Sequence, residues 1–238
     1  MKLRRAAIVV VALGLLAANP ALAQSLQDLP FAKKVKLAKV GDEDAQIAVA
    51  EAYEAGADGG QPDLAEAAKY YRLAALQGSI EAQYRLARLV SKGAKGLKQD
   101  FATAAKLYQD AAAKGHAPAM NALGQLYQNG QGVPADAAKA VEWYRKASDL
   151  NLADAQNNLG VMYLNGKGVA RDLGEALKLF AAAAGQGDGW GLNNLGGMYE
   201  MGWGTTKDMA KARDLYGQAA AKGNAAAQDN LKRIAVAP

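Results

Sequence analysis

The sequence predicts an all-α solenoid of five helix-turn-helix repeats with a capping helix at each end. Similar segments begin at intervals of 36 or 37 residues. Each segment holds two apolar patterns of helical period, separated by a glycine-containing break. Neither helix of such a pair can bury its apolar stripe alone, so the repeats are expected to stack on one another. The five copies cover residues 41–77, 78–114, 115–150, 151–186 and 187–222.

Residues 1–23 are predicted to form a secretory signal peptide. Lys2, Arg4 and Arg5 precede an apolar run from residue 6 to residue 18, and Ala21-Leu22-Ala23 is a small-x-small cleavage site. The run of 13 residues is short for a membrane span, although an uncleaved anchor is the alternative. We therefore expect a periplasmic or secreted protein, with no stable membrane insertion after cleavage.

Composition excludes several kinds of partner and chemistry. The predicted signal holds three basic residues and no acidic ones, so 25 basic and 23 acidic residues remain after it. No Lys/Arg block with interleaved aromatics follows, so a nucleic-acid partner is not expected. The chain has no cysteine, which rules out a lipoprotein anchor and leaves stability to packing.

Residues 24–40 are predicted to form an N-terminal capping helix that begins near Pro30, with its lysines towards solvent. Residues 223–238 are predicted to form a C-terminal capping helix and tail. In this partial sixth copy, Lys232 replaces the small residue of the full repeats, as expected where no further helix packs.

The five copies share a template of apolar, small, glycine and acidic positions. In the first helix, a buried apolar position is followed by a small residue that allows close packing. That helix ends at a glycine suited to left-handed backbone, and an aspartate then caps the second helix. The small residues are Ala50, Ala87, Gly124, Gly160 and Gly196; the glycines are Gly56, Gly93, Gly130, Gly166 and Gly202; the aspartates are Asp63, Asp100, Asp136, Asp172 and Asp208.

This template resembles the Sel-one-like repeat family, a branch of the tetratricopeptide-type helical repeats. The third repeat carries the motif as Ala119, Leu123, Gly124, Tyr127, Gly130, Gly132, Val133, Asp136, Ala140, Trp143, Tyr144 and Ala147. The resemblance covers roughly residues 41–234, although the first two repeats lack the Gly-x-Gly-Val loop. It implies a right-handed superhelical scaffold for protein–protein contact, often in the bacterial envelope.

Nucleophilic and metal chemistry are not expected. His116 is the only histidine, and it follows a repeat-initiating glycine, where a helix N-cap is expected. With one histidine and no cysteine, the usual zinc sets cannot be assembled, and no serine begins a Ser-x-x-Lys motif. We therefore predict no catalytic residue, no cofactor and no metal site.

By analogy with tetratricopeptide geometry, the first helices line a concave groove. Its candidate binding residues include Tyr84 and an asparagine ladder, with Gln125 and Val161 in the next row. Amides can pair with the backbone of an extended peptide, or they can bond neighbouring helices within the array. Both interpretations remain open at this point. The ladder is formed by Asn121, Asn157 and Asn193.

The fifth repeat departs most from the template. Trp190, Met201 and Trp203 lie outside the core positions, as an interaction hot spot would. The alternative is that both indoles pack against the C-terminal cap.

The function predicted from these observations is a non-catalytic interaction scaffold or adaptor of the bacterial envelope that binds a protein or peptide segment along its concave face. The alternatives are a β-lactam-binding or hydrolytic enzyme, and an envelope protein that binds peptidoglycan or another glycan.

Overall fold

A computed structural model describes residues 26–235, apart from the side chain of Asp58. The predicted signal peptide and the last three residues lie outside this range. Within it the structure is helical, with twelve α-helices, one 3-10 turn, an isolated bridge between Ala94 and Leu97, and no strand. The predicted all-α fold class is therefore confirmed.

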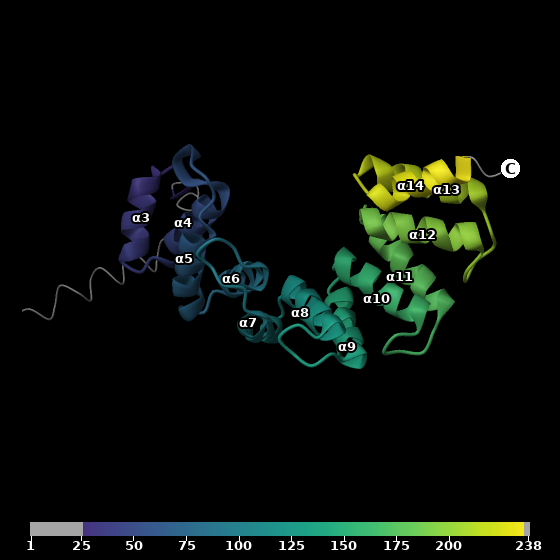
Figure 1. Cartoon of the computed structure of the whole chain (residues 1–238), viewed down its shortest axis with the longest axis horizontal. Coiled ribbons are helices and arrows are strands. Elements are labelled where there is room, and N and C mark those ends of the chain that lie inside the picture. The colour runs from purple at the N-terminus through teal and green to yellow at the C-terminus, as the bar shows by residue number, and fades with distance from the viewer. Residues whose placement is uncertain (1–25, 236–238) are drawn as a thin grey trace, which may run out of the picture. The chain divides into compact units, whose positions relative to one another are not determined.

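The described chain forms two compact units that divide after Ala111. The first contains α3, α4, the 3-10 turn, α5, α6 and most of α7; the second contains α8 to α14 (Figure 1). The helices of the first unit are α3 (Phe31–Lys39), α4 (Glu43–Ala55), α5 (Leu64–Leu76), α6 (Ile80–Lys92) and α7 (Phe101–Ala113), with the 3-10 turn at Ala57–Gly59.

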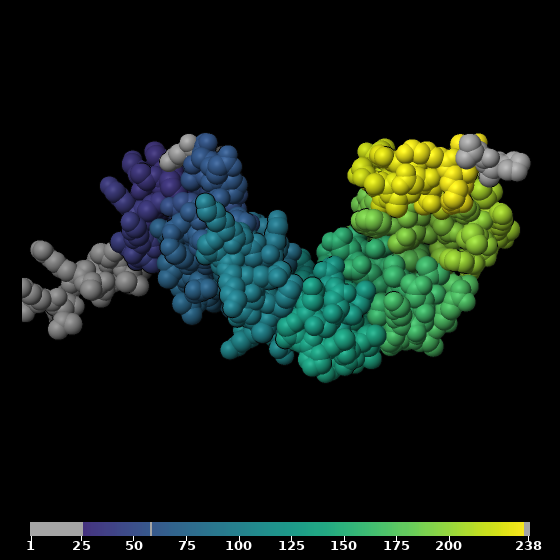
Figure 2. Space-filling model, viewed as in Figure 1, coloured from purple at the N-terminus to yellow at the C-terminus, as the bar shows by residue number. Residues whose placement is uncertain are grey.

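The helices of the second unit are α8 (Ala117–Asn129), α9 (Ala137–Asp149), α10 (Ala153–Asn165), α11 (Leu173–Gly185), α12 (Gly189–Met201), α13 (Met209–Ala221) and α14 (Ala225–Ala235). Within this unit, each helix packs on its neighbours in the chain from α8 to α14, and α10 also contacts α12. Figure 2 shows the same order as successive bands of surface from α8 to α14. Stacking thus lines up the first helices of consecutive repeats.

Local signals fix where the helices begin and end. All five predicted aspartate caps accept a backbone N–H within the first turn of their helix; Asp100, for example, accepts one from Thr103 at 2.9 Å. All five predicted terminal glycines have positive φ, which glycine adopts at little cost. His116 caps α8, where its Nδ1 accepts from the Ala119 N–H at 3.2 Å.

The small residue of the first helix makes room for an aromatic ring. A Cβ added to Gly160 would lie 2.7 Å from the Phe180 ring, and one added to Gly124 would lie 2.7 Å from Tyr144. The small residue thus allows close packing, as expected, and the ring of the second helix fills the space beside it. The aromatic is consequently buried in the core.

Each unit has a terminal helix, α3 at the start of the first unit and α14 at the end of the second. α3 begins after Pro30, as predicted, and buries Ala38 with Ala45 and Val49 of α4. In α14, the Lys232 side chain is 77% exposed, as expected if no further helix packs there.

Candidate interaction groove

Three first helices of the second unit, α8, α10 and α12, line one open hollow of about 570 Å³. We call it the amide groove because amides make up most of its wall. Its lining residues are Asn121, Gln125, Asp154, Asn157, Asn158, Val161, Trp190 and Asn194. The first helices therefore line a groove, as the repeat analogy predicted.

The groove brings together five of the nine residues singled out from the sequence, namely Asn121, Gln125, Asn157, Val161 and Trp190. Asn193 and Trp203 instead line a neighbouring hollow of about 150 Å³. Met201 is exposed but lines neither hollow, and Tyr84 belongs to the first unit, where its ring lies 6.0 Å from that of Tyr108.

The asparagine ladder is bonded between helices. The Asn158 amide donates to Asn121 Oδ1 at 2.9 Å, and the Asn194 amide donates to Asn157 Oδ1 at 2.7 Å. The third contact joins Asn230 to Asn193 at 3.0 Å.

Each ladder residue is less than one-tenth exposed. The side-chain oxygens of the three ladder asparagines therefore follow the second interpretation, because each accepts a hydrogen bond from a neighbouring helix within the array. The donors Asn158, Asn194 and Asn230 were missed from the sequence, although the doubled asparagines at 157–158 and 193–194 were a signal for them.

The two tryptophans of the fifth repeat lie in different surroundings. Trp190 is 57% exposed in the first turn of α12. The start of that helix is fixed by Asp188, whose carboxylate accepts from the Gly191 N–H at 2.5 Å. Trp203 is partly buried and packs on the core of the last repeats, as the alternative interpretation expected. Only Trp190 offers an indole face to the groove.

Asp154 is a groove residue that was not among the predicted site residues. It occupies the repeat position that Trp190 holds one repeat later. Burial raises the pKa of its carboxyl, and the nearby Asp188 raises it further. The signal for it was the acidic residue at this position in the first, second and fourth repeats.

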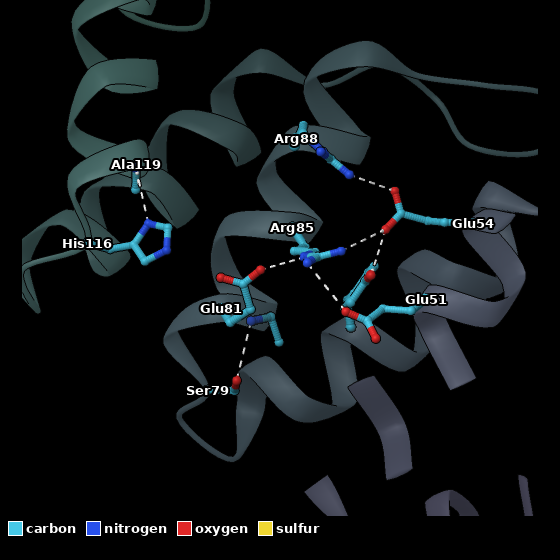
Figure 3. Close-up of polar contacts among 10 residues, drawn as sticks. Glu51, Glu54, Ser79, Glu81, Arg85, Arg88, His116 and Ala119 are labelled. Atoms are coloured by element: carbon cyan, nitrogen blue, oxygen red, sulfur yellow. Dashed lines mark hydrogen bonds and ion pairs between the residues drawn. The ribbon is translucent and has the colours of Figure 1, made fainter. Parts of the chain in front are cut away.

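A second polar arrangement ties α4 to α5 and α6 in the first unit (Figure 3). The Glu54 carboxylate accepts from the Tyr71 hydroxyl at 2.6 Å and from Arg88 at 2.9 Å. Arg85 lies between the carboxylates of Glu51, at 3.3 Å, and Glu81, at 2.5 Å. These paired charges join adjacent repeats.

The second unit repeats this arrangement at its end. Glu200 accepts from the Tyr216 hydroxyl at 2.7 Å and from both terminal nitrogens of Arg233, at 2.5 and 2.7 Å. The hydrogen bonds from Arg233 lower the pKa of Glu200, against the effect of burial. In the third repeat the equivalent pair is Tyr144 with Gln128, at 2.9 Å.

The fourth repeat has neither the hydroxyl nor its acceptor. Phe180 replaces the tyrosine, and Leu164 stands at the acceptor position. Both side chains belong to the same apolar cluster. The two positions therefore change together, from a hydrogen-bonded pair to an apolar one.

Within residues 26–235, no group of three or more His, Cys, Asp or Glu side chains is placed to hold a metal ion. Nor is any helix in that range long and apolar enough to span a membrane.

Comparison with known proteins identifies the repeats. The Sel1 repeat model matches residues 43–79, 80–116, 117–152, 153–188 and 191–224. No curated protein matches the chain.

Among solved structures, a Sel1 repeat protein of Oxalobacter formigenes is 32% identical with a TM-score of 0.73, over 86% of this chain and 58% of that one. A protective antigen of uropathogenic Escherichia coli with an SLR fold is 28% identical with a TM-score of 0.67, over 87% and 52%. This chain thus spans little more than half the length of these two relatives. It belongs to the Sel1 repeat family, whose members are generally protein-interaction scaffolds.

Proposed function

We propose that this protein is a non-catalytic scaffold of the bacterial envelope and that its second unit binds an extended segment of a protein partner in the amide groove. The observation that carries the proposal is the groove itself, which gathers eight residues from three consecutive repeats, among them the exposed indole of Trp190. Exposed tryptophan contributes strongly to binding energy in protein interfaces.

The ladder gives the groove a fixed shape. Asn121, Asn157 and their bonded neighbours hold adjacent first helices in register, so a partner would meet a preorganised surface. Gln125 is exposed on α8 and keeps donors and acceptors for a peptide backbone. The amide groove can thus bind the main chain of a partner segment through amides and one side chain of that segment through the indole.

Location in the envelope rests on the N-terminal sequence. The basic start, the apolar run and the Ala21-Leu22-Ala23 site are the pattern of an exported protein. The expected result is a mature protein in the periplasm or medium that begins at Gln24, checked by cell fractionation and N-terminal sequencing. An unprocessed protein in the cytoplasm would refute the envelope assignment.

The binding proposal can be tested by photocrosslinking in cells. A photoreactive residue at Gln125, which is exposed in the groove, should capture a discrete protein partner. The matched control is Glu142, which is exposed on the second helix α9, outside the groove lining. Asn157 is a poorer position because its side chain is buried and bonded to Asn194.

Trp190→Ala should reduce this adduct by about tenfold or more, since truncation of a hot-spot residue typically costs 2 kcal/mol or more. Because Trp190 is 57% exposed, the thermal melting curve measured by circular dichroism should change little. Equal capture from positions 125 and 142, or an adduct that Trp190→Ala leaves unchanged, would contradict the proposal.

A further inference from the structure

The charge of the amide groove is not balanced. Asp154 is the one side chain of its lining that carries a charge at neutral pH, since the others are amides, a valine and an indole. Within residues 26–235, Asp154 forms no salt bridge. The groove therefore presents a carboxylate without a cationic side-chain partner, and the N-terminal end of α10, in whose first turn Asp154 lies, offsets part of its charge.

The nearby charges reinforce this imbalance. Asp188 lies close enough to raise the pKa of Asp154, and it is committed to capping α12 through the Gly191 N–H. In the C-terminal helix α14, Arg233 is held by both carboxylate oxygens of Glu200. Asp154 is an exposed side chain in the lining of the groove, so a cation that entered the groove would reach its carboxylate and gain a favourable interaction with it.

The second wall of the groove suits a cation as well. Trp190 lines the same hollow as Asp154 and occupies the equivalent place one repeat further along the stack. A cation over an indole face gains about 0.5–2 kcal/mol, depending on its desolvation.

The protein forms this contact elsewhere: Lys146 Nζ lies 4.1 Å from the centroid of the Trp143 ring. Within the described residues, no cation lies over Trp190. Its exposed face is open to a partner.

From this geometry we propose that the groove recognises its peptide partner through a lysine or arginine side chain, whose cation is held by the Asp154 carboxylate and the Trp190 indole. The inference rests on the proposed binding function and specifies the chemistry of the ligand. The exposed Gln125 amide contacts the peptide backbone, whose donors and acceptors are the same at nearly every residue. Specificity therefore comes from one basic residue.

A random-peptide display library selected on the immobilised full-length protein tests both ideas separately. Peptides that depend on the groove should be retained by the unmodified protein and lost on Trp190→Ala. They should share a lysine or arginine at one aligned position. Replacing that residue by norleucine should weaken binding about tenfold, measured by fluorescence polarisation with synthetic peptides.

Variants of Asp154 give the sharper test. Asp154→Asn should weaken the selected basic peptides about tenfold, whereas the matched control Asp149→Asn, at an exposed site on the end of α9, should leave binding unchanged. Asp154→Lys should select peptides with an acidic residue at the same position. Circular dichroism melting curves of both Asp154 variants verify that the repeats still fold.

Groove-dependent peptides without a shared basic residue, or with unchanged affinity for Asp154→Asn, would overturn the cation inference and leave the binding function standing. If no peptide depends on Trp190, both proposals fail.

Discussion

The co-variation of Phe180 and Leu164 leads to a quantitative prediction. Phe180 is fully buried, with 0% exposure. In Phe180→Tyr the added hydroxyl would face Leu164, where the third and fifth repeats have Gln128 and Glu200 as acceptors. A buried hydroxyl without a partner costs about 1–3 kcal/mol, so the single variant should be destabilised by that amount.

Leu164→Gln supplies the missing acceptor at the position where Gln128 stands in the third repeat. Alone, it should cost about 1 kcal/mol, because a partly buried leucine leaves the apolar cluster. Combined with Phe180→Tyr, it should restore the hydrogen bond. The double variant should then be more stable than the sum of the single effects predicts, by about 1–2 kcal/mol.

The assay is urea unfolding followed by far-ultraviolet circular dichroism and by tryptophan fluorescence. Since stability in a repeat array is the sum of repeat and interface terms, agreement of the two probes is needed before a free energy is extracted. Phe180→Tyr with Leu164→Ala is the matched control, because it removes the same leucine without adding an acceptor. The coupling energy of each pair is the departure of the double variant from the sum of its two single effects. A coupling energy below about 0.5 kcal/mol for Phe180→Tyr with Leu164→Gln would refute the reasoning, as would an equal coupling energy for Phe180→Tyr with Leu164→Ala.

Two further predictions concern packing and pH. Gly160→Ala should destabilise the protein by about 1–3 kcal/mol, because its Cβ would lie 2.7 Å from the Phe180 ring. Gly217→Ala, also within a helix but with nothing within 4 Å, should stabilise it by about 0.5–1 kcal/mol; urea midpoints that move together would contradict this account. Arg233 lowers the pKa of Glu200 below its ordinary value of 4.5, so the ionised carboxylate stabilises the fold above that pH. This contribution should disappear as pH falls through the folded-state pKa. In Glu200→Gln, the free energy of unfolding should therefore fall less steeply as pH is lowered below 4.5. An unchanged slope in that pH range would argue against the role of Glu200.

Much of the fold follows from local chemistry. An aspartate beside the N–H groups of a helix start, a glycine at the left-handed end and an apolar stripe every 3.6 residues act within a few residues of one another. Five copies of such a pattern leave few alternatives to stacked helix pairs. His116 could be expected to cap α8 for the same reason, since its place in the repeat is a capping place.

The partners of polar side chains depended on packing between repeats. Asn121 and Asn158 are 37 residues apart in sequence, and only the stacking of α8 and α10 shows that one donates to the other. The two interpretations of the ladder have the same sequence pattern, because an asparagine can bond a helix or a peptide with equal chemistry. Trp190 and Trp203 likewise looked alike until the second was found against the core.

The sequence by itself thus determined the repeat, its two helices and their caps, because each depends on contacts within one repeat. The tertiary structure alone decided which side chains remain open to a partner. Asp154 shows the difference: its position was visible in the repeat alignment, but its unpaired charge in a groove beside Trp190 emerges only when consecutive first helices pack side by side.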